Sequence, residues 1–240
     1  IYDYINYTGD QKYLAEYGLE VLIGIARFWA QRVHWSQNFG RYEMHGVTGP
    51  NEYENNVNNN WYTNYSAQWC MSYAADQLAA LRLSSPKDAT RIEQKTNFQN
   101  EELAQWKETA ENMYLPKDDT LNVVLQQAGF LDKELVKAAD LNPAERPINQ
   151  HWSWDRILRS PYIKQADVLQ CFFFFENKFS SKELEKHFDF YEPFTVHESS
   201  LSPCVHSIQA AVLGRMEQAY TFYLRTSRLD LDDYNKEVEE

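Results

Sequence analysis

Cysteine, glycine and proline are scarce in this chain of 240 residues, which contains 3 Cys, 8 Gly and 8 Pro. Three scattered cysteines are too few for a disulfide scaffold, and an odd number suits a reducing compartment better than secretion. Low glycine and proline argue against a turn-rich β protein and against a low-complexity or disordered chain. The composition therefore favours a folded helical protein, and we expect it in the cytoplasm.

Positive charge is also scarce, since 23 Lys and Arg stand against 35 Asp and Glu, for a formal net charge of −12. Nucleic acids and membrane surfaces are themselves negatively charged, so neither is an expected partner. The longest apolar run, residues 171–175, is far shorter than the ~20 residues that span a bilayer. The chain opens at Ile1 inside a plausible helix, without Met or a basic leader, so we expect a piece of a longer protein.

Aromatic residues are abundant, and apolar residues recur with the helical period. Between Asp10 and Trp35 they form a broad stripe, with Asp10 as a candidate N-cap. Similar patterns predict helices over residues 60–83, 98–114, 133–139, 162–176, 181–191 and 203–225, brief strands at 41–44 and 122–125, and a loop at 141–149. No repeat and no Gly/Ser linker divides the chain, so we expect a single all-α piece of antiparallel helix hairpins.

The most unusual stretch covers residues 46–64, where Gly49-Pro50 precedes Glu52 and six Asn fall within residues 51–60. Asn amides both donate and accept hydrogen bonds, as binding of a polyhydroxylated ligand requires, and aromatic faces can stack on a sugar ring. Asn60 and Tyr62 are therefore candidate sugar-binding residues, and Glu52 is a candidate general acid. An ordinary surface loop, in which Asn tolerates turn geometry, explains the same composition.

Two further segments place polar groups at expected helix starts. Lys164 and Gln165 begin the helix expected over residues 162–176 and could grip a hydroxyl or a phosphate, although a helix-surface lysine is more often only solvated. Ser199 and Ser200 precede the helix expected from Pro203, where hydroxyls and backbone N–H groups would converge as in an anion site. Capping of that helix by Ser202 is the simpler explanation.

Other chemistries find little support in the sequence. It contains no Gly-rich phosphate loop and no cysteine pair with metal-ligand spacing. No G-x-S-x-G elbow accompanies His197 or His206, and Cys204 next to His206 lacks an oxyanion signature. We therefore expect neither a metal site nor a cysteine or serine nucleophile.

Taken in order, these stretches resemble the maltose phosphorylase family of inverting glycoside phosphorylases, and the resemblance covers essentially all 240 residues. The segments that carry it fall into three groups. They are residues 49–53, 58–60 and 62–64, similar to the catalytic-acid region; residues 164–169, similar to a sugar-site motif; and residues 199–202, 206–207 and 229–233, similar to the region before the last phosphate ligands.

The resemblance implies that residues 1–240 are the C-terminal half of an (α/α)6 barrel, the catalytic domain of a longer chain. It implies that Glu52 is the proton donor, that Lys164 and Gln165 belong to the sugar site, and that Ser199 and Ser200 donate hydrogen bonds to phosphate. Phosphate is then a co-substrate, no metal or organic cofactor is needed, and a homodimer is expected.

The implied reaction is cleavage of maltose by inorganic phosphate, with inversion, to β-D-glucose 1-phosphate and glucose. Phosphate is already an anionic nucleophile, so no catalytic base is required. Three alternatives stay open. A related phosphorylase would act on trehalose, kojibiose or nigerose; an acid-trehalase-like hydrolase would need a carboxylate opposite Glu52; and a non-catalytic helical module would only bind sugar.

Overall fold

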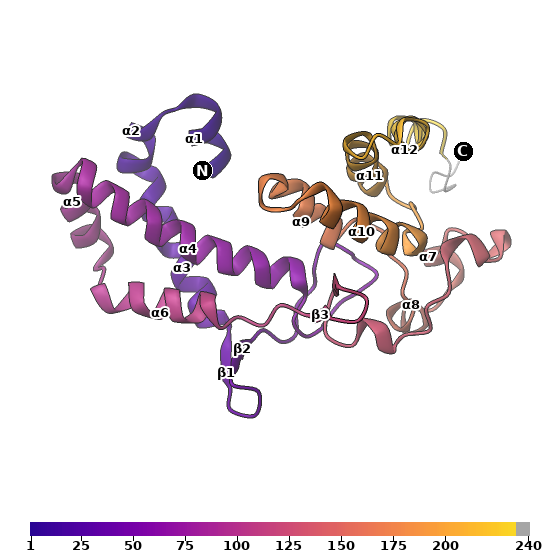
Figure 1. Ribbon diagram of the computed structural model, residues 1–240, viewed down its shortest axis with the longest axis horizontal. Coiled ribbons are helices and arrows are strands. Elements are labelled where there is room, and N and C mark those ends of the chain that lie inside the picture. Colours follow the sequence, from indigo (N-terminus) through magenta and orange to yellow (C-terminus); the bar gives the residue numbers. More distant parts are fainter. Residues whose placement is uncertain (234–240) are drawn as a thin grey trace. The chain divides into compact units, whose positions relative to one another are not determined.

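The computed structural model describes residues 1–233, which fall into two compact units (Figure 1). Unit 1 contains residues 1–44 and 64–114, and unit 2 contains residues 45–63 and everything described from residue 115 onward. The predicted all-α class is confirmed, because helices dominate both units and the strands form only two short hairpins. Within residues 1–233, no helix is both long and apolar enough to cross a bilayer. The prediction of a single domain piece stays a prediction.

Unit 1 is helical apart from one hairpin. Its elements are α1 (Tyr2–Thr8), α2 (Gln11–Tyr13), the π-helical turn η1 (Leu14–Gly18), α3 (Leu19–Arg32), β1 (His34–Ser36), β2 (Arg41–Glu43), α4 (Trp61–Ser84, whose first three residues belong to unit 2), α5 (Pro86–Thr96) and α6 (Asn100–Glu111).

The first long helix of unit 1 consists of α2, η1 and α3, which follow one another without a break, as the sequence predicts. The Asp10 side chain accepts a hydrogen bond from the Tyr13 N–H at 3.0 Å, so Asp10 is the expected N-cap. Buried Leu19 and Ile23 lie on the apolar stripe. The helix ends at Arg32, three residues earlier than expected, because the chain becomes extended there and enters β1.

The helix α4 ends at Ser84, one residue beyond the predicted end, and the next two residues begin a helix that was not predicted. Ser85 is the N-cap of α5 and Pro86 takes its first position, where a missing N–H costs nothing. Ala89 and Ile92 bury the inner face of α5. The predicted helix over residues 98–114 corresponds to α6, which is a few residues shorter.

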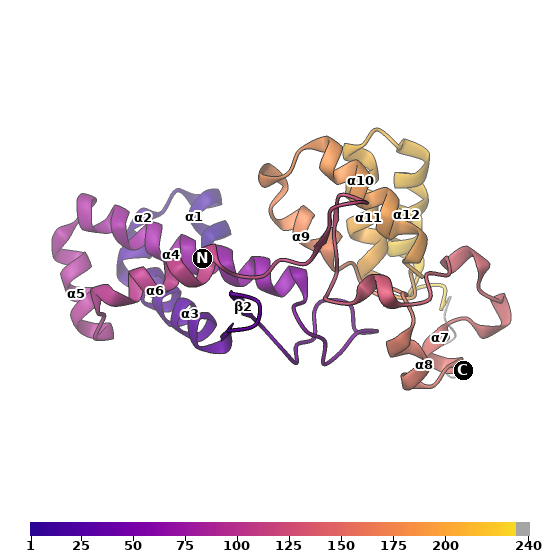
Figure 2. The ribbon, with the colours of Figure 1, turned by 60° about the horizontal axis from the view of Figure 1, so that its bottom comes forward.

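Unit 2 combines short irregular turns with four neighbouring helices, α9 to α12, which Figure 2 shows grouped together. Its described elements are β3 (Lys117–Asp118), β4 (Val123–Val124), the 3-10 turns η2 (Phe130–Asp132), η3 (Ala138–Asp140) and η4 (Pro143–Glu145), α7 (Ile148–His151), α8 (Trp154–Arg159), α9 (Val168–Phe174), η5 (Glu176–Lys178), α10 (Ser181–Tyr191), η6 (Glu192–Phe194), α11 (Leu201–Val212) and α12 (Met216–Arg228).

Three helices expected in unit 2 were predicted wrongly. Residues 133–139 form no α-helix, and only the last two belong to the 3-10 turn η3. Lys133 is extended and its ammonium group bonds to two backbone carbonyls. The helix expected from Tyr162 begins only at Val168, since Ile163 pairs with Thr195 in a backbone bridge. The last expected helix is divided into α11 and α12 at Gly214, whose φ of 74° is left-handed. By contrast, α10 has the predicted bounds.

One apolar cluster of unit 2 contains residues that lie next to the predicted site residues in the sequence. It consists of Tyr53, Ile148, Ile157, Tyr162 and Val196, all buried. These side chains come from segments far apart in the sequence, and burying them together removes apolar surface from water. The cluster therefore brings the Glu52 turn close to the loop that precedes α11.

Candidate active site

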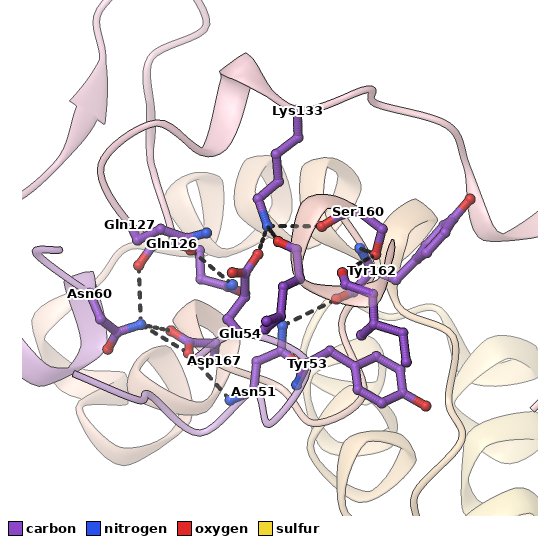
Figure 3. Close-up of polar contacts among 12 residues, drawn as sticks. Asn51, Tyr53, Glu54, Asn60, Gln126, Gln127, Lys133, Ser160, Tyr162 and Asp167 are labelled. Atoms are coloured by element: carbon purple, nitrogen blue, oxygen red, sulfur yellow. Dashed lines mark hydrogen bonds and ion pairs between the residues drawn. The ribbon is translucent and has the colours of Figure 1, made fainter. Parts of the chain in front are cut away.

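The turn that carries Glu52 is docked onto residues 162–167 through the side chain of Asn51. This side chain is fully buried (0 % exposed). Its Nδ2 donates to the carbonyl of Tyr162 at 3.2 Å (Figure 3). Its Oδ1 accepts from the N–H of Lys164 at 2.9 Å and from the N–H of Tyr53 at 3.2 Å. An amide that both donates and accepts can join the two segments in this way.

A buried carboxylate lies beneath the same turn. Both oxygens of Asp167 lie 3.0 Å from Asn60 Nδ2, and Oδ2 also accepts from the N–H of Asn51 at 3.4 Å (Figure 3). Burial raises the pKa of Asp167 to about 7, although these hydrogen bonds lower it. Gly49 lies directly against this group, and a Cβ there would come within 2.4 Å of Asp167 Oδ2. Any larger residue at position 49 would have to displace the buried carboxylate.

Asn60 and Tyr62, the predicted sugar-binding residues, lie at the start of α4. Asn60 is buried: its Nδ2 also donates to the Gln126 carbonyl at 3.1 Å, and its Oδ1 accepts from the N–H of Thr63 at 2.9 Å as a helix cap. The structure thus occupies the Asn60 amide within the protein, and a sugar contact by it stays a prediction. Tyr62 is half-buried, with its ring 6.4 Å from that of Phe174.

Glu52 contacts Lys164 and Gln165, although more than a hundred residues of sequence separate it from them. Lys164 Nζ lies 3.2 Å from Glu52 Oε2, and Gln165 Oε1 accepts from the N–H of Glu52 at 3.1 Å. The side chain of Glu52 is 60 % exposed. Its pKa is lowered by hydrogen bonding to Gln165 and then by Lys164. The accessible carboxylate of Glu52 therefore lies beside both predicted sugar-site residues.

The expectation that Lys164 and Gln165 begin a helix is wrong. They lie in the non-helical segment before α9, and the last residue of that segment, Asp167, turns its carboxylate to Asn60 instead of capping α9. Neither residue therefore lies at a helix N-terminus, and their side chains contact Glu52 instead.

The loop carrying the predicted phosphate residues is held by side chains that donate to three of its backbone carbonyls. Arg146 donates to the carbonyl of Val196, Arg225 to that of His197 at 2.9 and 2.6 Å, and Thr226 to that of Ser200. His197 has a φ of 53°, in the left-handed region where a non-glycine residue is held only by its surroundings.

Ser199 and Ser200 lie half-buried at the start of α11. The helix begins at Leu201, two residues earlier than expected, so Ser200 is its N-cap residue but makes no side-chain cap hydrogen bond. The Ser199 hydroxyl accepts from the N–H of Leu201 at 3.3 Å. Capping by Ser202 was the wrong explanation, because that hydroxyl lies 3.1 Å from His197 Nδ1. Both predicted phosphate-binding serines thus lie immediately before the first residue of α11.

Sequence reasoning missed the role of Glu198, next to these serines. Its side chain is only 3 % exposed. Oε2 accepts hydrogen bonds from the Tyr53 hydroxyl at 2.9 Å and from the N–H of Ile148 at 3.0 Å, while Oε1 accepts from Arg146 Nε at 3.1 Å. This carboxylate links the Glu52 turn to the serine loop. Its place beside Ser199 was the only sequence signal that could have drawn attention to it.

Comparison with known proteins places these residues in a common context. Residues 1–240 match the model of the glycosyl hydrolase family 65 central catalytic domain. The chain is 52% identical over 240 residues to maltose phosphorylase of Bacillus subtilis (strain 168), covering 100% of this chain and 31% of that protein. It is 38% identical over 238 residues to α,α-trehalose phosphorylase of Thermoanaerobacter brockii, covering 99% and 31%.

A solved structure, a proposed kojibiose phosphorylase from the human microbiome, has a TM-score of 0.89 and 37% sequence identity to this chain. The likeness covers 98% of this chain and 32% of that one. The chain therefore spans about a third of the length of these relatives. Together with the helical structure, the matches confirm the predicted fold class, half of an (α/α)6 barrel.

Proposed function

The chain belongs to glycosyl hydrolase family 65, and from this membership we propose that its parent protein is a disaccharide phosphorylase that cleaves maltose with inorganic phosphate. The products are β-D-glucose 1-phosphate, formed with inversion, and glucose. Relatives named as phosphorylases of maltose, trehalose and kojibiose support phosphorolysis of a disaccharide. The higher identity to a maltose phosphorylase supports maltose as the substrate.

The contact of Lys164 and Gln165 with Glu52 carries this proposal. A glycosidic oxygen leaves poorly unless it is protonated as the bond breaks, so Glu52 must hold a proton when the sugar is bound. In the structure, Gln165 and then Lys164 lower the pKa of Glu52. When sugar hydroxyls replace the carboxylate as partners of these side chains and exclude water, both effects weaken. The pKa of Glu52 then rises, and the carboxyl takes up the proton it delivers.

The surroundings of the serine loop favour a phosphorylase over a hydrolase. An inverting hydrolase needs a second carboxylate ~6.5–9.5 Å from the acid to activate water. Glu198, the carboxylate beside Ser199 and Ser200, is buried and bonded to Tyr53, Ile148 and Arg146. It is not placed to activate water. Two hydroxyls at the start of α11 instead suit an anionic nucleophile.

An assay of the full-length protein tests the proposal. We expect maltose to yield glucose and β-D-glucose 1-phosphate in equal amounts, and only when phosphate is present. Trehalose, kojibiose and nigerose are assayed in parallel, and faster turnover of any of them would overturn maltose as the substrate. Glucose release without phosphate would indicate a hydrolase, and sugar binding without cleavage a non-catalytic module.

The contact between Lys164 and Glu52 has a pH-dependent consequence. We expect Lys164→Met to move the basic limb of kcat/KM for maltose toward higher pH, because the free enzyme must protonate Glu52 and Lys164 lowers its pKa. The pH profile at saturating phosphate measures this shift, and an increased KM for maltose should accompany it.

The matched control is Lys107→Met, which removes the same charge from an exposed lysine of unit 1 that pairs with Glu111 at 3.8 Å. It should leave the limb in place. If Lys164→Met also leaves the limb in place while raising the KM for maltose, Lys164 binds sugar but does not control the proton on Glu52.

The remaining parts of the proposal follow from the family resemblance and the composition. The full-length protein is proposed to act as a homodimer in the cytoplasm, with maltose and phosphate as substrates and without a metal or organic cofactor. The three cysteines remain free thiols within the described residues, which suits a reducing compartment.

A further inference from the structure

The side chain of Tyr53 reaches from the Glu52 turn to the serine loop, across 145 residues of sequence. It is 1 % exposed, and its ring packs in the apolar cluster with Ile148 and Val196. Its hydroxyl lies 2.9 Å from Glu198 Oε2 and 3.3 Å from Asn149 Oδ1. The hydroxyl has one proton, which goes to the nearer and charged acceptor, Glu198.

Glu198 is in turn fixed by groups from another segment. Arg146 binds both the Glu198 carboxylate and the carbonyl of Val196, and the N–H of Ile148 donates to the carboxylate at 3.0 Å. The backbone at His197 is held by Arg225. The carboxylate is therefore a fixed anchor, and the Tyr53 hydroxyl is the group by which the acid turn attaches to it.

We propose that Tyr53 and Glu198 are positioning residues whose hydrogen bond sets the acid turn in register with the phosphate-binding serine loop. The inference rests on the proposed function. Protonation of the leaving oxygen and attack by phosphate act on the same bond, so the two segments must be placed accurately with respect to each other. Small errors of placement cost large factors in rate. Neither side chain needs to touch the sugar or phosphate.

The test uses two glucosyl donors in the full-length enzyme. Maltose needs a proton on its leaving oxygen. In α-glucosyl fluoride, the C1–F bond breaks and C1–O to phosphate forms, while fluoride leaves with its electron pair and needs no proton. We expect Tyr53→Phe to lower kcat for maltose roughly 10- to 100-fold, but to lower kcat for the fluoride far less. A merely structural defect would reduce both rates equally.

A double-substitution cycle identifies the partner. Glu198→Gln should show a substrate-dependent loss of its own, which includes its bond to Arg146. Combining it with Tyr53→Phe should cost less than the sum of the two single losses, because the hydrogen bond between these two side chains can be lost only once. The matched control is Tyr42→Phe, which removes a tyrosine–carboxylate hydrogen bond of 2.8 Å to Glu108 in unit 1. It should preserve the rate ratio.

The outcomes separate this inference from the function on which it rests. Equal losses with both donors, no loss, or additive effects in the double variant would overturn the positioning role while leaving a working phosphorylase. A wild-type enzyme that performs no phosphorolysis of any disaccharide would overturn both. Should the wild type prefer another disaccharide, the comparison with the fluoride is made with that substrate.

Discussion

Glu52→Gln in the full-length enzyme is expected to lower the turnover of maltose by about 10²–10⁴-fold, the usual contribution of general acid catalysis, with the value near the upper end. A sugar alkoxide is a poor leaving group, and the amide has no proton of suitable acidity to give. The side chain is 60 % exposed and forms an ion pair with Lys164 at the surface. The fold should therefore be retained, as circular dichroism and the melting temperature can show.

The fluoride substrate makes this test specific. The same variant should retain most of its turnover of α-glucosyl fluoride with phosphate, because that leaving group needs no proton. Glu134→Gln, at an exposed position of unit 2, provides a matched control and should leave both rates unchanged. Near-wild-type turnover of maltose by Glu52→Gln would remove Glu52 from the role of acid.

The acid turn shows how far the sequence leads and where it stops. Gly49-Pro50 before Glu52 predicts a turn because of the backbone preferences of these residues. The need for glycine at position 49 has a different cause, the closeness of Asp167, which lies more than a hundred residues away in the sequence. Sequence patterns report local preferences, whereas the burial of Asp167 depends on which distant segments meet.

Some helix boundaries were predicted wrongly for similar reasons. The apolar residues between 162 and 176 have helical spacing, but a bridge to Thr195 and the bonds to Asn51 hold the first six in a non-helical form. Tertiary contacts thus override the local pattern and turn Lys164 and Gln165 toward Glu52. The division at residues 63–64 lies inside α4, so no linker composition could have marked it.

Replacing both Ser199 and Ser200 by Ala is expected to raise the Michaelis constant for phosphate at least tenfold. Hydrogen bonds to a charged group contribute roughly 1.5–3 kcal/mol each, and a tenfold change needs only ~1.4 kcal/mol. The start of α11 adds a further ~0.3–1 kcal/mol for an anion, which the double variant retains. Phosphate binding should thus become weaker without being abolished. Initial rates at varied phosphate and saturating maltose measure the effect.

The Michaelis constant for maltose should change much less, because the sugar contacts are assigned to Lys164 and Gln165. Ser207→Ala is the matched control: its hydroxyl lies further along α11 and donates to the carbonyl of Ala219 at 2.8 Å. It should leave the phosphate constant unchanged. α-Glucosyl fluoride adds a second criterion, since its cleavage needs phosphate but no acid. In the double variant, the Michaelis constant for phosphate should rise as much with this donor as with maltose. If the Michaelis constants for maltose and phosphate rise equally, or the constant for phosphate does not change, the serines only shape the start of α11 and phosphate binds elsewhere.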